Sequence, residues 1–141
     1  MTLDKKDKKA LSDIRMSKAR EFLADADANV KDKRFRSSVN RAYYAALNAV
    51  RALLVIEGIN PETHEGAVTM LSLRFVKTGM LPVDVMKGFK TLLSRRAEVD
   101  YGDFDTIGNA EAEDSLKSAG FIIETIDILR NNLLAELYKE G

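Results

Sequence analysis

Two adjacent arginines, an aspartate and a tyrosine lie close together near residue 100. Arg95 and Arg96 are followed by Asp100 and Tyr101. At 100° per residue, Arg96 shares a helix side with the apolar Phe89, and Asp100 falls one turn further on that side. A charge aimed at the core needs a partner, because stranding one member of a buried pair costs about 3–5 kcal/mol. Arg96 and Asp100 therefore form either a structural salt bridge or part of a site in which guanidinium groups bind phosphate.

A polar strip on a second predicted helix, at about residues 36–57, offers partners for this charged pair. Asn40, Tyr44, Asn48 and Arg51 recur at intervals of three or four residues, so they share one face of that helix. Two interpretations stay open for this strip: a solvated polar face, or a surface that binds a ligand together with the arginines.

Other catalytic chemistries find little support in the sequence. His64 is the only histidine and cysteine is absent, which excludes a histidine pair, a thiol nucleophile and a thiolate metal site within one chain. At a predicted helix start, His64 is interpreted as a surface residue or a neighbour of the cap. The carboxylates of residues 100–105 lack the spacing of a calcium loop, and no glycine-rich phosphate-binding loop or nucleophile elbow occurs. We expect no metal and no cofactor.

Helices account for nearly all of the predicted structure. The two prolines and eight glycines fall mostly between segments whose apolar residues recur at helical spacing. The helix at about 36–57 is apolar on two faces, so it should be central. The sequence predicts an all-α fold, an antiparallel four- to five-helix up-and-down bundle, as one domain over residues 1–141 with a flexible N-terminus of about residues 1–8. The other predicted helices cover about 8–30 and 64–76, a segment that begins near Pro82, and a long segment that begins near Gly108.

Composition limits the classes of partner. The chain has 141 residues, of which 45% are apolar and 31% charged, and its net charge is zero. A protein that wraps nucleic acid through general positive charge is therefore excluded, and any RNA must meet a local patch, such as the basic and aromatic residues at 31–44 and 87–96. No apolar run approaches the roughly 20 residues that span a bilayer. We expect no export signal, no membrane contact and a cytoplasmic location.

Four motifs, in this order and spacing, closely resemble a group of prokaryotic HEPN-domain proteins: Ser38–Ala45, Thr63–Gly66, Phe75–Gly79 and Arg96–Tyr101. The resemblance covers about residues 8–135. It implies a helical bundle that dimerises and is often encoded beside a minimal nucleotidyltransferase, with which it forms a toxin–antitoxin or substrate-binding pair.

The resemblance also implies a catalytic motif, from which this chain departs. Many HEPN proteins are metal-independent ribonucleases with an arginine, four to six residues and then a histidine. With four intervening residues, Arg95 leads to Asp100 and Arg96 leads to Tyr101, so neither register reaches a histidine. Aspartate places negative charge near phosphate, and tyrosine is a poor base at neutral pH. Tyr101 would correspond to a tyrosine that the partner nucleotidyltransferase modifies with AMP in related toxins.

Three hypotheses follow. In the first, the chain is a partner subunit of a nucleotidyltransferase, in a toxin–antitoxin-like pair, and a homodimer cleft binds RNA or nucleotide. In the second, it is a ribonuclease toxin with Asp100 or Tyr101 in place of the histidine. In the third, it is a non-catalytic dimerisation module whose contact is the alanine-lined face of the second helix. The cleft of the first hypothesis would be lined by Arg95, Arg96, Asp100, Tyr101, Asn40, Tyr44 and Lys77.

Overall fold

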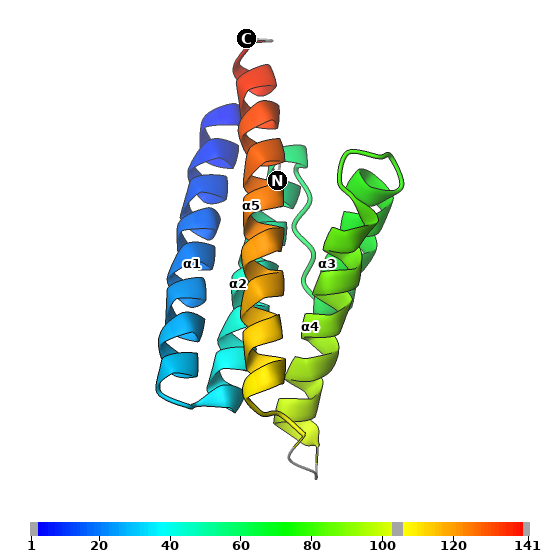
Figure 1. Cartoon of the computed structure of the whole chain (residues 1–141). Coiled ribbons are helices and arrows are strands. Elements are labelled where there is room, and N and C mark those ends of the chain that lie inside the picture. The colour runs from blue at the N-terminus through cyan, green and yellow to red at the C-terminus, as the bar shows by residue number, and fades with distance from the viewer. Residues whose placement is uncertain (1–2, 103–105, 140–141) are drawn as a thin grey trace.

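The computed structural model describes residues 3–102 and 106–139, which form a helical bundle (Figure 1). The long helices lie side by side, and the short third helix packs beside the fourth. This confirms the predicted all-α bundle of four to five helices. No helix in these two ranges is long and apolar enough to cross a membrane. In chain order the elements are α1 (Lys5–Lys31), α2 (Phe35–Leu54), the 3₁₀ turn η1 (Val55–Glu57), α3 (His64–Leu71), the π-helical turn η2 (Ser72–Val76), α4 (Val83–Tyr101) and α5 (Asn109–Lys139).

The first helix begins earlier than the apolar spacing indicated. Asp4 is its N-cap, and the Asp4 carboxylate accepts a hydrogen bond of 2.8 Å from the backbone N–H of Asp7. Such a cap stabilises a helix start by about 1 kcal/mol. Residues 5–8, which the sequence analysis assigned to a flexible N-terminus, are therefore helical, and residues 1–2 lie outside the described part of the chain.

Helix α2 is central, as predicted, because it contacts α1, α3, α4 and α5. The alanines that line one of its faces, Ala45, Ala49 and Ala52, have no exposed surface within the single chain. The expectation that this face forms a dimer contact is therefore wrong. Small side chains in a row allow helices to approach closely, and the sequence alone does not say whether the neighbouring helix belongs to the same chain.

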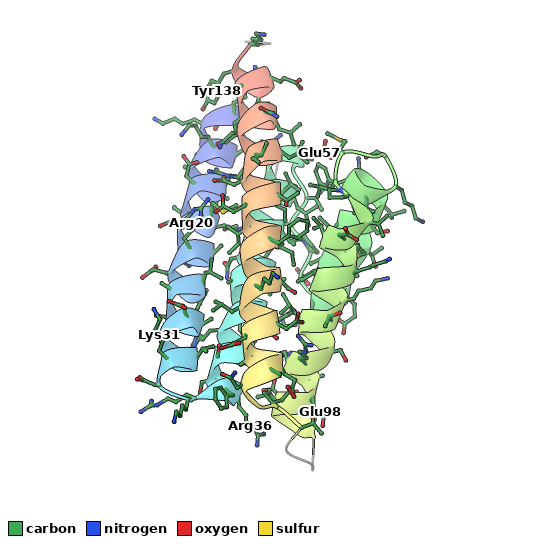
Figure 2. All side chains as sticks on the ribbon, in the orientation of Figure 1. Arg20, Lys31, Arg36, Glu57, Glu98 and Tyr138 are labelled. Carbon is green, nitrogen blue, oxygen red and sulfur yellow. The ribbon has the colours of Figure 1, made fainter. Side chains whose placement is uncertain are left out.

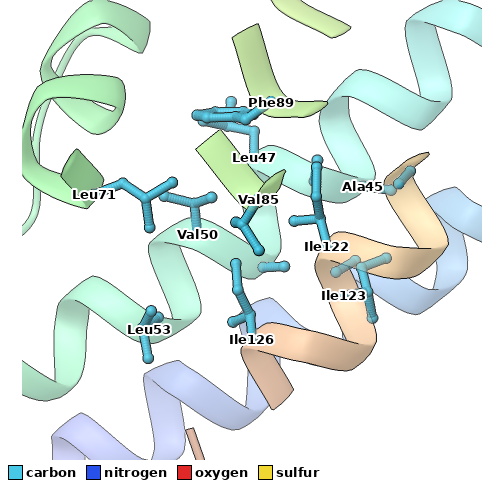
Figure 3. Packing of buried hydrophobic residues seen from close by; sticks show 14 of the residues in the cluster. Ala45, Leu47, Val50, Leu53, Leu71, Val85, Phe89, Ile122, Ile123 and Ile126 are labelled. Carbon is cyan, nitrogen blue, oxygen red and sulfur yellow. The ribbon is translucent and has the colours of Figure 1, made fainter. Parts of the chain in front are cut away.

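The core lies where α2 packs against the other helices, and Figure 3 shows the part of it between α2, α3, α4 and α5. Leu47 and Val50 of α2 face Phe89 of α4 and Ile122 of α5, and all four side chains are at most 1% exposed. Full burial of an aliphatic or aromatic side chain contributes about 1.5–3 kcal/mol. This packing fixes the height and rotation of α4 relative to α2, and it therefore sets which α4 side chains meet the polar strip of α2.

The segment between α2 and α4 folds back along the bundle. Gly58 ends η1 with φ of 76°, a left-handed conformation that glycine adopts without strain. The Thr63 hydroxyl then accepts a hydrogen bond of 2.9 Å from the N–H of Gly66 and caps α3. His64 begins α3 and Lys77 follows η2, so the two residues lie at opposite ends of this short helical segment. The segment runs antiparallel to α4.

Candidate functional site

Arg96 is held between α4 and the polar strip of α2. Its Nη2 donates a hydrogen bond of 3.2 Å to the Tyr44 hydroxyl. Its guanidinium carbon lies 5.6 Å from the ring centre of Tyr43 and 5.7 Å from that of Tyr44, within the range of cation–π attraction. Its Nε lies 2.9 Å from Oδ2 of Asp100, one turn further along α4. The contact of Arg96 with Asp100, expected from the helical wheel, is present, and Arg96 also contacts Tyr44 of the polar strip.

The ion pair between Arg96 and Asp100 leaves much of the guanidinium's hydrogen-bonding capacity unused. The 2.9 Å distance is that of an ion pair, but Nε of Arg96 makes no well-directed hydrogen bond within the described residues. A guanidinium has five N–H donors, and the bond to Tyr44 uses one of them. With 21% of its side chain exposed, Arg96 can still donate to an anion from solvent.

Tyr43 forms the buried floor of this arrangement. Its ring stacks on Phe89 at 6.0 Å between centres and meets Tyr44 edge to face at 5.2 Å. The side chain is fully buried, and its hydroxyl has no hydrogen-bonding partner among the described residues. Burial raises the pKa of the Tyr43 hydroxyl to about 12, although the charge of Arg96 acts in the opposite direction. Tyr43 is thus a neutral phenol at any physiological pH.

His64 joins the same cluster from the start of α3, although the sequence analysis interpreted it as a surface or capping residue. Its ring lies 5.4 Å from that of Tyr43 and 6.2 Å from that of Tyr44. Burial lowers the pKa of His64, and the charges of Arg96 and Arg51 lower it further. The spacing of residues along α3 carries no signal for this contact, because it depends on how the loop at 58–63 returns the chain to α2.

Arg95 lies on a different side of α4 from its neighbour. Its Nη1 is 2.7 Å from Oδ2 of Asp114 and 3.1 Å from the hydroxyl of Ser115, both on α5. Consecutive residues on a helix point about 100° apart, so one arginine faces α2 and the other faces α5. Within one chain, Arg95 does not join the Arg96 cluster.

Lys77 and Tyr101 also lie apart from the cluster. Lys77 is exposed just after η2, beyond the other end of α4, and the helix from Val83 to Arg96 is about 20 Å long at 1.5 Å per residue. Tyr101 is the last residue of α4, and 80% of it is exposed. It is therefore accessible to another molecule. Asp103 and Asp105, which the sequence analysis considered with the same loop, lie outside the described residues.

A small polar depression of about 220 Å³ continues the cluster toward the end of the bundle. Asn40 lines it, one turn before Tyr44 on α2, and so does Val99, three residues after Arg96 on α4. Nη2 of Arg36 donates a hydrogen bond of 2.6 Å to the carbonyl oxygen of Val99 and joins the two helices there. Figure 2 shows Arg36 and Glu98 at this end. The remaining lining residues are Ser37 and Arg41.

The donor groups of this region indicate which kind of ligand it suits. Across residues 3–102 and 106–139, no group of three or more histidine, cysteine, aspartate or glutamate side chains is placed to hold a metal ion. The arrangement is instead suited to an anion, because guanidinium and phenol groups are hydrogen-bond donors.

A family model for the HEPN domain matches residues 12–129. The chain belongs to the HEPN domain family. The match includes the whole of α2, α3 and α4, and thus every residue of the Arg96 cluster and of the polar depression.

Known relatives agree with this assignment. A UPF0332 protein of Thermotoga maritima is 32% identical over 116 residues, which is 82% of this chain and 88% of the relative. A protein of Methanocaldococcus jannaschii named "Putative toxin MJ0605" is 31% identical, with 77% of this chain and 80% of the relative covered. The crystal structure of TT1696 from Thermus thermophilus has the same fold, with a TM-score of 0.73 at 18% identity, and the match covers 84% of this chain and 97% of that one.

This HEPN domain thus divides its predicted site residues into three groups. Arg96 contacts both Tyr44 and Asp100, and Asn40 lines the depression one turn before Tyr44 on α2. Tyr101 is exposed at the end of α4, while Arg95 and Lys77 lie elsewhere. The imidazole that the motif on α4 lacks is present in the structure on α3, next to the same tyrosines.

Proposed function

We propose that this HEPN domain binds phosphate groups of RNA or nucleotide at the Arg96 site, defined as Arg96 with Tyr44, Asp100, Asn40 and Arg36. The observation that carries the proposal is the partly exposed side chain of Arg96, whose guanidinium is held by Tyr44 and Asp100 while most of its N–H groups make no hydrogen bond to the described residues. A preoriented guanidinium binds phosphate oxygens in a bidentate manner at little entropic cost. Asp100 then has the role of orienting the arginine.

The neighbouring depression supplies further donors for the same ligand. Arg36 and Arg41 bring positive charge to its rim, and Asn40 brings an amide. Tyr101, which is 80% exposed, offers an aromatic face on which an unpaired base can stack. Because the net charge of the chain is zero, this local group has to supply the attraction.

Measurement of RNA affinity tests the proposal. A short fluorescent single-stranded RNA is titrated with purified protein, and anisotropy is recorded. Arg96→Ala should weaken binding at least about tenfold, since hydrogen bonds to charged groups contribute about 1.5–3 kcal/mol. Arg74→Ala is the matched control, because Arg74 is exposed on η2, away from the site. Equal affinity of a folded Arg96→Ala protein and of the control would refute the proposal.

The salt dependence of the same binding reports the number of phosphates. Each phosphate neutralised on a single strand contributes about 0.7 to the slope of log affinity against log salt. A site of this size contacts about one to three phosphates, so we expect a slope of about −1 to −2. A slope near zero would contradict phosphate recognition.

The identity of the partner is the second part of the proposal. Resemblance to HEPN proteins supports a homodimer that associates with a minimal nucleotidyltransferase in a toxin–antitoxin-like pair, and the names of the relatives from M. jannaschii support the toxin part. The exposure of Tyr101 is what AMP transfer to its hydroxyl would require. In this reaction the Tyr101 oxygen bonds to the α-phosphate of ATP, and pyrophosphate and the phenol proton leave. Incubation with ATP and a minimal nucleotidyltransferase should therefore add the mass of one AMP, and Tyr101→Phe should abolish that addition. Addition of AMP to the Tyr101→Phe protein would show that another residue is the acceptor and would refute the role of Tyr101.

A ribonuclease toxin is the second candidate, favoured by those names and by the imidazole of His64, which lies beside the tyrosines that Arg96 also contacts. Asp100 is a weak choice as its proton acceptor, because its carboxylate lies 2.9 Å from the Arg96 guanidinium that it holds. Purified protein is incubated with end-labelled RNA from about pH 5.5 to 8.5 in EDTA, a range that spans the ordinary pKa of histidine. Cleavage that Arg96→Ala abolishes would support this activity, and intact RNA throughout would refute it.

A further inference from the structure

The one histidine of the chain lies where three helices bring aromatic and basic groups together. His64 begins α3, its ring contacts Tyr43 and Tyr44 of α2, and those two rings also carry the guanidinium of Arg96 from α4. The imidazole and the guanidinium therefore share the same pair of tyrosines, although they are far apart in sequence. His64 is half-buried rather than fully enclosed, so part of its side chain is open to solvent.

The charges around His64 oppose its protonation in the free protein. Burial lowers its pKa first, and the positive charges of Arg96 and Arg51 add to this effect, whereas Glu65 raises it. Nε of Arg51 and the hydroxyl of Tyr43 are also buried without a hydrogen-bonding partner among the described residues. The titratable groups that face the imidazole are Glu65 of α3, Tyr43, Tyr44 and Arg51 of α2, and Arg96 of α4.

A bound phosphate would reverse this balance. An anion placed at Arg96 offsets the arginine charges that disfavour an imidazolium, and it offers an acceptor for an imidazole N–H. The phosphate then attracts both the guanidinium of Arg96 and the imidazolium of His64, and this attraction offsets the repulsion between the two cations. A simple structural role for His64, such as filling space beside the tyrosines, would not give this coupling between ligand and proton.

We propose that His64 completes the Arg96 site and binds the same phosphate group as Arg96, taking up a proton when the phosphate binds. The inference rests on the proposed function, since it assumes that phosphate is bound at Arg96. It assigns a ligand-contacting role to a residue outside the motif on α4.

The sign of the resulting pH dependence follows from linkage. If the ligand raises the pKa of His64, the complex binds one more proton than the free protein between the two pKa values. Binding is therefore strongest below the lowered pKa of the free protein and weakens as the pH rises through the pKa of the complex. Each pH unit by which the ligand raises this pKa corresponds to about a tenfold gain in affinity at acid pH.

Nuclear magnetic resonance can measure this pKa without assignment, because the chain has one histidine. A protein freed of any histidine tag is titrated from about pH 5 to 8.5, alone and saturated with a short single-stranded RNA, and the imidazole Hε1 signal is followed. We expect a pKa below the ordinary value of 6.5 in the free protein and a rise on RNA binding. Arg96→Gln should raise the free value, because it removes a lowering charge, whereas the control Arg74→Gln should not.

RNA affinity as a function of pH provides the second readout. Wild-type affinity should increase about tenfold or more as the pH falls from about 8 to 5.5, and His64→Gln should remove most of that increase. Bound RNA with an unchanged His64 pKa, and the same pH profile in His64→Gln, would overturn this inference and leave phosphate binding at Arg96 intact. Absence of RNA binding to the wild type at every pH would instead refute the proposed function and this inference with it. The wild-type titration decides the question even if His64→Gln does not fold.

Discussion

Removal of the Tyr43 hydroxyl should stabilise the protein, whereas removal of the hydroxyl next to it in sequence should destabilise it. In Tyr43→Phe the ring keeps its stacking on Phe89 and its contact with Arg96, and only an oxygen without a partner is lost. In Tyr44→Phe the hydrogen bond from Arg96 is lost. The two variants change the same atom type on consecutive residues and differ in whether that atom is satisfied.

The magnitude follows from the cost of an unsatisfied buried polar group, which is about 1–3 kcal/mol. Because the space of the hydroxyl is left empty, we expect a net gain of about 1 kcal/mol for Tyr43→Phe. The bond to Tyr44 involves a charged donor, but Arg96 can be rehydrated at its exposed edge, so its loss should cost about 1 kcal/mol. The free energies of unfolding of the two variants should therefore differ by about 2 kcal/mol.

Urea denaturation followed by circular dichroism measures both free energies, and thermal melting should place the two midpoints several degrees apart, at about 3 °C per kcal/mol for a domain of this size. Tyr43 is neutral throughout because its pKa is about 12, so assays across the neutral pH range should agree. A Tyr43→Phe protein that is less stable than the wild type by about 1 kcal/mol or more would show that the hydroxyl is satisfied, and the reasoning would fail.

Two further pairs of variants test the helical frame that carries the site. Arg130 is 8% exposed, and its ion pair with Asp13 at 2.7 Å joins α5 to α1, while a second ion pair at 2.8 Å links it to Asp127 within α5. Arg130→Met should cost about 2–3 kcal/mol. Arg20→Met should cost at most about 1 kcal/mol, because the ion pairs of Arg20 lie at the surface. Similar losses in the two proteins by urea denaturation would contradict this. Gly58→Ala should cost about 1 kcal/mol because φ is 76° there, whereas Gly120→Ala, in a helix with no atom within 4 Å of the new Cβ, should gain about 0.5–1 kcal/mol. Melting temperatures of Gly58→Ala and Gly120→Ala that shift in the same direction would refute this pair of predictions.

Features set by local periodicity were predictable, and features set by how one element lies against another were not. The wheel placed Arg96 and Asp100 on the core side because both belong to one helix, and their contact follows from spacing alone. The wheel gives no information on which helices lie next to α4. The first hypothesis placed Arg95 in one cleft with Arg96, although these side chains meet different helices. Lys77 belongs to one of the motifs of the resemblance, and this was the basis for placing it in the cleft. In the structure it lies far from Arg96.

His64 is the opposite case, because the sequence analysis left it out of the site and the structure places it beside Tyr43 and Tyr44. Near the N-terminus of a short helix, His64 has the local pattern of a surface residue, and its place beside Tyr43 and Tyr44 depends on a loop that reverses the chain. The alanine face of α2 was ambiguous for a related reason. Small apolar side chains suit close helix packing, whether α1 of the same chain or a second molecule covers them, and the structure shows that they are buried within the chain.

A net charge of zero conceals an uneven distribution of ion pairs, and this distribution bears on what the site can bind. Between α1 and α5, the arginines Arg20 and Arg130 contact carboxylates at 2.7–2.8 Å. At the junction of α2 and α4, Arg36 donates to the carbonyl of Val99 and Arg96 donates to the hydroxyl of Tyr44, and neither acceptor is charged. Arg96 is also paired with the carboxylate of Asp100. Some positive potential therefore remains there. At physiological salt it decays over about 8 Å, which favours a nucleotide or a short single-stranded segment over a long duplex.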